Sequence, residues 1–114
     1  MKHLHGYFNS QYIDRKDLKY SVRGNFTSLP ANEAENHTKN NLIHIHYHKI
    51  EEWDGNLNPP QTADLFIMQR DNQWDIGYYR NQQFIPSPTH FNSWLQDVIL
   101  ENYIQLEEKA QFQI

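Results

Sequence analysis

Within the segment 42–50, residues 43–48 alternate strictly between apolar residues and histidine. Its apolar positions are Ile43, Ile45 and Tyr47, and the positions between them are His44, His46 and His48. Successive side chains of a β-strand point to opposite faces of a sheet, so this pattern predicts a strand with one apolar face. The chain is therefore expected to fold around a sheet that buries one face and displays three imidazoles on the other.

Other parts of the chain carry strand and helix signals of their own. Alternation or β-prone composition predicts strands over 20–29, 42–50, 65–69, 74–79 and, as a short edge strand, 83–85. The loop 70–73 has the length and chemistry of a hairpin connection. A helix is predicted over 88–108. Ser87 can cap it, Pro88 fits its first turn, and the apolar residues that follow have three- and four-residue spacing. The segment 7–19 fits a short helix or two loops.

The length of the chain and its short connections define the expected architecture. A chain of 114 residues suits a single domain over 1–114. Parallel strands need crossovers of a dozen or more residues, which these connections do not provide. We therefore predict an α+β fold, an antiparallel sheet of four to five strands packed by one long C-terminal helix. An exposed connection is expected over 31–41, and a turn over 53–56 followed by an exit from the sheet at 58–60.

Several classes of chemistry are excluded by missing residues. The chain has no cysteine, which removes disulfides, thiolate metal sites and cysteine catalysis. None of its four glycines lies in a phosphate-binding loop, and no GxSxG motif is present. No apolar run resembles a signal peptide or approaches the roughly 20 residues of a membrane span. We therefore expect a cytoplasmic protein with no membrane partner.

The histidines are candidates for a metal site. Alternate strand residues lie about 6.7 Å apart, so His44 and His46 can converge on one ion, whereas His48 is too far from His44 to share it. A third ligand must be brought by the fold, and the candidates are Glu51, Glu52, His37, His90 and the pair His3/His5. Nitrogen and oxygen donors admit zinc, iron, nickel or manganese. An open position on such an ion would support hydrolysis or oxygen chemistry.

The pair His44 and His46, followed by Glu51, resembles the first metal motif of the cupins, where two histidines and a later glutamate share an ion. The resemblance covers eight residues and lacks both the flanking glycines and the second histidine motif of that family. It implies that a divalent transition metal binds these three residues, with His48 beside them. Two other interpretations stand next to it. The histidines are the ordinary polar side of an antiparallel strand, or they respond to pH because clustered imidazoles titrate near neutrality.

The basic residues are concentrated near the N-terminus. Residues 1–30 hold five basic and two acidic side chains, whereas residues 31–114 hold five and twelve, for formal charges of +3 and −7. Four of these residues form a candidate cluster, namely Arg15, Lys16, Lys19 and Arg23. Together with nearby tyrosines, this cluster could bind single-stranded nucleic acid. The overall charge of −4 favours the other interpretation, in which the aromatics are core and the cations only solvate it.

The lack of a complete catalytic set favours a binding function. The candidate partner-binding residues are Trp53, Asp54 and Asn56 in a loop stiffened by prolines, and Glu101 and Glu108 on the helix. A core position is the alternative for the tryptophan. We expect a non-enzymatic protein without a cofactor that docks on another protein, as an inhibitor, immunity factor or phage accessory protein. The alternatives are a metal-dependent enzyme or carrier built on the histidine pair, and a nucleic-acid binder.

Overall fold

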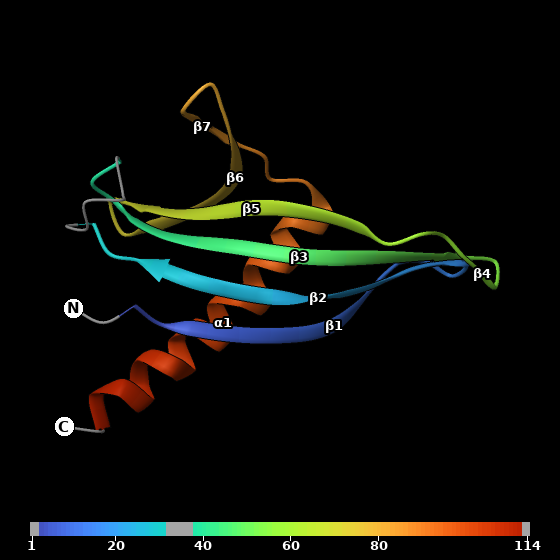
Figure 1. The fold of residues 1–114 in the computed structure, drawn as a ribbon, viewed down its shortest axis with the longest axis horizontal. Helices are drawn as coiled ribbons and strands as arrows, with labels where there is room; N and C mark the ends of the chain where they lie inside the picture. The colour runs from blue at the N-terminus through green and yellow to red at the C-terminus, as the bar shows by residue number, and fades with distance from the viewer. Residues whose placement is uncertain (1–2, 32–37, 113–114) are drawn as a thin grey trace.

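One antiparallel sheet and one helix make up the part of the chain that the computed structural model describes, residues 3–31 and 38–112 (Figure 1). The elements are β1 (His5–Arg15), β2 (Leu18–Leu29), β3 (Asn41–Trp53), β4 (Asn56–Leu57), β5 (Gln61–Arg70), β6 (Gln73–Arg80), β7 (Gln83–Pro86) and α1 (His90–Phe112). The strand order is β1-β2-β3-β5-β6-β7, and the short β4 pairs with the end of β3. The sheet is therefore a meander, in which neighbours in space follow one another along the chain.

Tight turns produce this meander. Two residues separate β3 from β4, β5 from β6 and β6 from β7, and in all three turns both residues have φ between 48° and 81°. Positive φ at both central positions is the requirement of a type I′ turn, whose twist matches the twist of the flanking strands. The predicted hairpin around 70–73 and the predicted turn over 53–56 are confirmed. The chain also leaves the sheet at 58–60, where two prolines remove backbone donors.

The core lies between the sheet and α1. Leu95 and Ile99 on the helix have no solvent exposure, and they pack over sheet residues that are equally buried, namely Val22, Phe26, Ile45 and Ile67. Removing one such side chain from water contributes roughly 1.5–3 kcal/mol. The prediction that Ile43, Ile45 and Tyr47 point inward is confirmed, since all three are buried.

The sheet has more strands than the sequence analysis predicted. The expectation of four to five was wrong because seven strands form, among them β1, which occupies most of the segment predicted as a short helix or two loops (7–19). Its inward positions are Gly6, Phe8, Ser10 and Tyr12. Only two of these side chains are large, so the apolar alternation is weak. The charged run that follows contains the turn between β1 and β2 and obscured the strand.

The helix also begins later than predicted. The nitrogen of Asn92 donates to Thr89 Oγ1 at 3.1 Å, so Thr89 rather than Ser87 caps α1, and Pro88 precedes the helix instead of lying in its first turn. Most of the predicted connection 31–41 falls on residues 32–37, outside the described residues. Within the described residues, no helix combines the length and the apolar character that a bilayer crossing requires.

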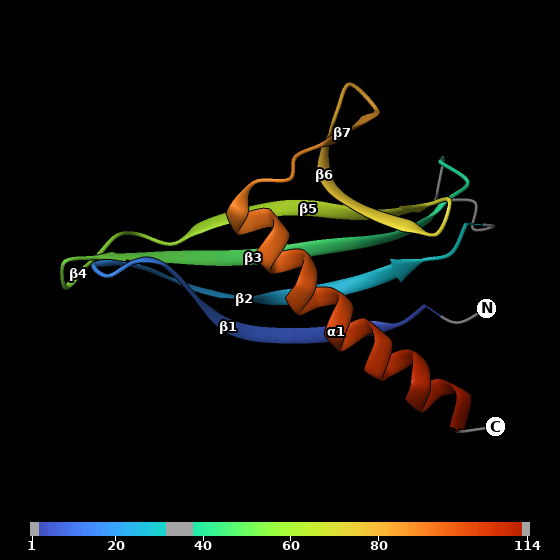
Figure 2. The ribbon, with the colours of Figure 1, turned by 180° about the vertical axis from the view of Figure 1, so that it is seen from behind.

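The helix covers only one face of the sheet. It crosses the strands diagonally, and Figure 2 shows its C-terminal end running past β1 while the strand ends near β4 extend beyond its other end. Figure 1 shows the opposite face, over which no element of the described chain passes. We call this second surface the open face. It carries the even-numbered residues of β3, because the odd-numbered ones face the helix.

Candidate functional site

Three rows of side chains cross the middle of the open face from β1 to β5. Cross-strand pairing aligns four residues in each row, and each row contains one histidine of β3. The rows are His5, Thr27, His44 and Phe66; Tyr7, Asn25, His46 and Asp64; and Asn9, Arg23, His48 and Thr62. We call these twelve residues the histidine rows. The predicted display of His44, His46 and His48 on one side of a strand is thus confirmed.

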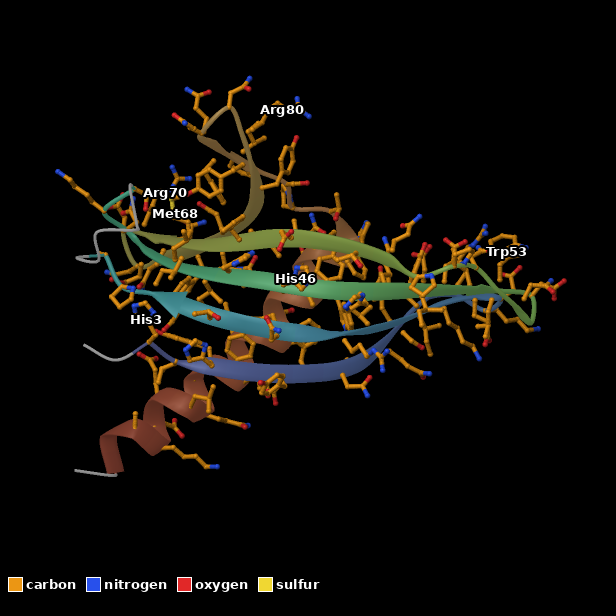
Figure 3. All side chains as sticks on the ribbon, viewed as in Figure 1. His3, His46, Trp53, Met68, Arg70 and Arg80 are labelled. Carbon is orange, nitrogen blue, oxygen red and sulfur yellow. The ribbon has the colours of Figure 1, made fainter. Side chains whose placement is uncertain are left out.

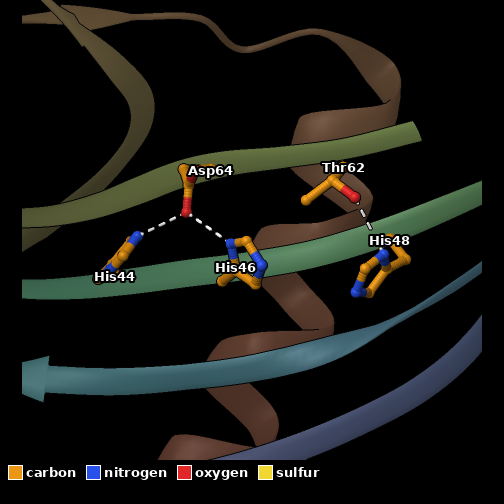
Figure 4. A network of polar contacts seen from close by, with 5 residues as sticks. All are labelled: His44, His46, His48, Thr62 and Asp64. Carbon is orange, nitrogen blue, oxygen red and sulfur yellow. Dashed lines mark hydrogen bonds and ion pairs between the residues drawn. The ribbon is translucent and has the colours of Figure 1, made fainter.

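Asp64 lies between two of the imidazoles (Figure 4). His44 Nε2 donates to Asp64 Oδ1 at 2.8 Å, and His46 Nδ1 donates to the same oxygen at 2.9 Å. A carboxylate only accepts hydrogen bonds, so these contacts fix which ring nitrogen carries a proton in each histidine. No carboxylate of β5 was predicted from the sequence to lie beside these rings. Asp64 was missed because the pairing of β3 with β5 is what brings it opposite His46.

The two histidines determine the charge state of Asp64. Partial burial raises the pKa of the carboxyl, but the hydrogen bonds from His46 and His44 and their positive charge outweigh it and hold the pKa below the ordinary 3.8. Asp64 is therefore ionised at neutral pH. Its side chain is 49% exposed, so water screens the interaction and its contribution to stability is at most about 1 kcal/mol.

Neighbouring contacts hold the remaining rings. His48 Nδ1 shares a hydrogen bond of 3.0 Å with Thr62 Oγ1, and His5 Nδ1 shares one of 3.2 Å with Thr27 Oγ1. His44 stacks on Phe66 with 4.7 Å between ring centroids and 10° between planes. Hydrogen bonds and stacking limit the rotamers of these side chains, so the open face presents an ordered set of planar groups.

The histidine rows carry few charges. Arg23 and Asp64 are the only two residues of the twelve that are charged irrespective of histidine protonation, and neither lysine nor glutamate occurs among them. Beside the rows is a shallow hollow of about 180 Å³, lined mainly by Asn9, Ser21, Arg23, His48 and Ile50. The surface is thus broad and polar with one small depression.

The structure separates Glu51, the proposed third metal ligand, from the histidine pair, and the candidate His37 lies outside the described residues. Glu51 lies on the helix-facing side of β3, where it contacts Tyr20 and accepts a hydrogen bond of 2.6 Å from Asn58 Nδ2. It therefore does not join His44 and His46, as the cupin motif would require. The single sheet also differs from the double-sheet jelly roll of that family. Among the described residues, no group of three histidine, cysteine or carboxylate side chains has the geometry of a metal site.

The basic residues proposed for nucleic-acid binding do not form one surface. Arg15 faces the helix side, where its guanidinium lies 4.5 Å from the Trp53 ring, and Lys16 is in the turn between β1 and β2. Lys19 and Arg23 are on the open face, but Lys19 is directly opposite Glu52. The alternation of the strand has divided the cluster between two faces.

The proposed partner-binding residues lie in two places. Trp53, Asp54 and Asn56 are exposed at the end of the sheet that projects past the helix, far from His46 (Figure 3). Trp53 is 41% exposed, so it is not a core residue. Glu101 and Glu108 are exposed on α1, on the other side of the sheet from the histidine rows. The two sets of residues are therefore separate from each other, and both are separate from the histidine rows.

Another cavity lies away from the histidine rows. It has a volume of about 400 Å³ and lies between α1 and the end of the sheet near Leu4. Burial, and secondarily Glu107, raise the pKa of Tyr103 at this cavity to about 12, so the hydroxyl stays protonated and bonds to Glu107. Ser28 Oγ, also in the lining, accepts a hydrogen bond from Leu4 N. None of the metal-ligating, partner-binding or nucleic-acid-binding residues predicted from the sequence lines this cavity.

Comparison of the chain with protein-family models, curated proteins and solved structures gives no significant match.

Proposed function

We propose that the chain is a non-enzymatic binding protein that docks on another protein through the histidine rows. The observation that carries the proposal is their composition, which is rich in histidine, asparagine, threonine and aromatic residues and contains no lysine or glutamate. The centres of protein interfaces are likewise enriched in aromatic residues and depleted of lysine and glutamate. The internal hydrogen bonds of the rows reduce the side-chain entropy lost on binding, which favours affinity.

Arg23 and His48 indicate the chemistry of the partner. They are cross-strand neighbours and line the hollow together with Asn9 and Ser21. Among the described residues, Arg23 forms no ion pair. Its charge is therefore available to a carboxylate, and we propose an acidic protein surface that places one carboxylate side chain in the hollow. A phosphate backbone fits less well because the rows hold a single permanent cation.

A module of this kind acts by covering part of its partner. That mode of action is the one expected of an inhibitor, an immunity factor or a phage accessory protein. The metal alternative is less favoured, because both imidazole nitrogens that approach Asp64 already donate to it. An ion would have to replace both hydrogen bonds.

The test is capture of a partner with matched charge variants. Immobilised protein is exposed to lysate of the source cell, in parallel with Arg23→Glu and with Arg80→Glu. Arg80 is an exposed arginine on β6, outside the rows, so its reversal changes the net charge equally. We expect a stoichiometric acidic protein that is retained by the unmodified chain and by Arg80→Glu and is lost with Arg23→Glu.

Three outcomes would contradict the proposal. The first is retention of nucleic acid in place of protein, and the second is equal loss of the partner with both arginine variants. The third is a stoichiometric transition metal in the purified protein that disappears in His46→Ala, which would favour the metal alternative.

A further inference from the structure

The two edges of the sheet differ in how they are protected. β7 forms one edge and is only four residues long, ending at Pro86. β1 forms the other edge, and within the described residues its single neighbour is β2. From His5 to Ile13 it contains no proline, lysine or other permanently charged residue, the features with which proteins prevent pairing at an open edge. β1 is therefore available to another strand.

The backbone groups along this edge can be assigned from one hydrogen bond. Ser28 N donates to Leu4 O at 2.8 Å, so the backbone of Leu4 points toward β2. Because the direction alternates along a strand, the even-numbered residues of β1 bond to β2 and the odd-numbered ones point outward. The outward donors and acceptors belong to His5, Tyr7, Asn9, Gln11 and Ile13.

The side chains of β1 are self-complementary about Ser10. Tyr7 and Ile13 are 82% and 63% exposed, lie on the same face of the sheet, and are equally distant from Ser10 along the chain. Antiparallel pairing of β1 with a second β1 around Ser10 places Tyr7 of each copy opposite Ile13 of the other. Asn9 then lies opposite Gln11, and both pairs use outward-pointing backbone groups. Each exposed apolar side chain is thereby covered by the other copy.

We infer that two copies of the chain associate through β1, antiparallel and with the two-fold axis at Ser10, into one continuous sheet. This association is independent of the proposed function, because it uses the edge of the sheet and not the hollow beside Arg23. One pair of strands buries less surface than the roughly 1,600 Å² of a standard interface, so the dimer forms reversibly and depends on concentration.

The first test is the mass in solution as concentration rises. We expect the unmodified chain to approach twice 13.8 kDa in sedimentation equilibrium. The double variant Tyr7→Lys with Ile13→Lys, which places like charges opposite each other, should stay at the single-chain mass. Tyr7→Lys with Ile13→Glu alters the same two exposed positions with opposite charges and should restore the doubled mass. A single-chain mass for the unmodified protein at all concentrations, or a dimer that persists in the Lys/Lys variant, overturns the inference.

The second test fixes the register with one introduced cysteine, since the chain has none of its own. Residue 10 is opposite itself in a non-hydrogen-bonded pair, whose Cα atoms are about 4.5 Å apart, within the range of a disulfide. Two copies of residue 9 are diagonal neighbours about 7–8 Å apart, which is too far. Under mild oxidation Ser10→Cys should form a covalent dimer and Asn9→Cys should not. Equal cross-linking of both variants, or of neither, contradicts the register.

Discussion

Asp64 shows how much of the open face depends on one carboxylate. Its Oδ1 accepts from His44 at 2.8 Å and from His46 at 2.9 Å, so both rings take their orientation from β5 rather than from their own strand. Removing the negative charge leaves two imidazoles without an acceptor. At the scale of single residues, Asp64 is therefore the group that orients both rings.

The pH dependence of stability follows from the depressed pKa of Asp64. Its folded-state pKa is below the 3.8 of an unperturbed carboxyl, so ionised Asp64 stabilises the fold above that value. The stabilisation is lost as pH falls through the lower, folded pKa. Urea unfolding at a series of pH values measures this loss. Between about pH 5 and about pH 2, the free energy of unfolding should fall by up to about 1 kcal/mol more in the unmodified protein than in Asp64→Asn. Asp54→Asn, at an exposed turn, is the control and should behave like the unmodified protein.

A Cβ at Gly24 would also disturb the rows. An alanine side chain there would overlap the backbone oxygen of His46, and it would come within 2.7 Å of the Cα of Tyr47. Backbone atoms cannot move aside as the end of a side chain can, so β2 and β3 would have to separate locally. We expect Gly24→Ala to lower the free energy of unfolding by more than about 2 kcal/mol and to shift the His46 ring resonances in NMR spectra. Unchanged resonances and stability would show that the strands accommodate the methyl group.

Among the elements, α1 determines whether the sheet has a core. Its buried positions, Leu95 and Ile99, have zero exposure, whereas Ile104 on the same helix is 51% exposed. The Ile99→Ala variant should lose about 2–5 kcal/mol of unfolding free energy because it leaves a cavity. Ile104→Ala removes the same atoms from the solvent-facing side of the helix. It should lower the free energy of unfolding by less than about 1 kcal/mol. Equal losses in urea unfolding would mean that the helix does not pack as described.

Elements with strong local signals could be predicted from the sequence, and long-range neighbours could not. The alternation at 42–50 gave the correct faces for Ile45 and His46, and turn residues located the hairpin after β5. β1 was missed because its inward Gly6 and Ser10 weaken the alternation. Asp64 was missed for a different reason. A periodic pattern says which face a side chain occupies, but not which strand lies beside it.

The whole molecule is flat. Its extents are 47 × 37 × 22 Å and its radius of gyration is 15.2 Å, whereas a compact domain of about 100 residues has roughly 13 Å. The difference arises because a single helix covers a wide sheet on one face, and the strand ends near β4 project past it (Figure 2). A flat shape gives a large surface for docking relative to the core that supports it.

Small-angle X-ray scattering at high dilution tests this shape. We expect a radius of gyration close to 15.2 Å for the variant Tyr7→Lys with Ile13→Lys, in which association is blocked. A value near 13 Å would mean that the sheet curls or that the projecting end folds back. The unmodified chain should show a larger value as concentration rises.

Because α1 follows all seven strands in the sequence, its position affects how the chain folds during synthesis. During synthesis the strands leave the ribosome first, and the apolar face formed by Val22, Phe26, Ile45 and Ile67 meets solvent before its cover exists. At about 5–20 residues per second, this nascent sheet stays bare for on the order of seconds. A premature stop codon before Leu95 would therefore yield an aggregation-prone product and a substrate for proteases, not a shortened working protein.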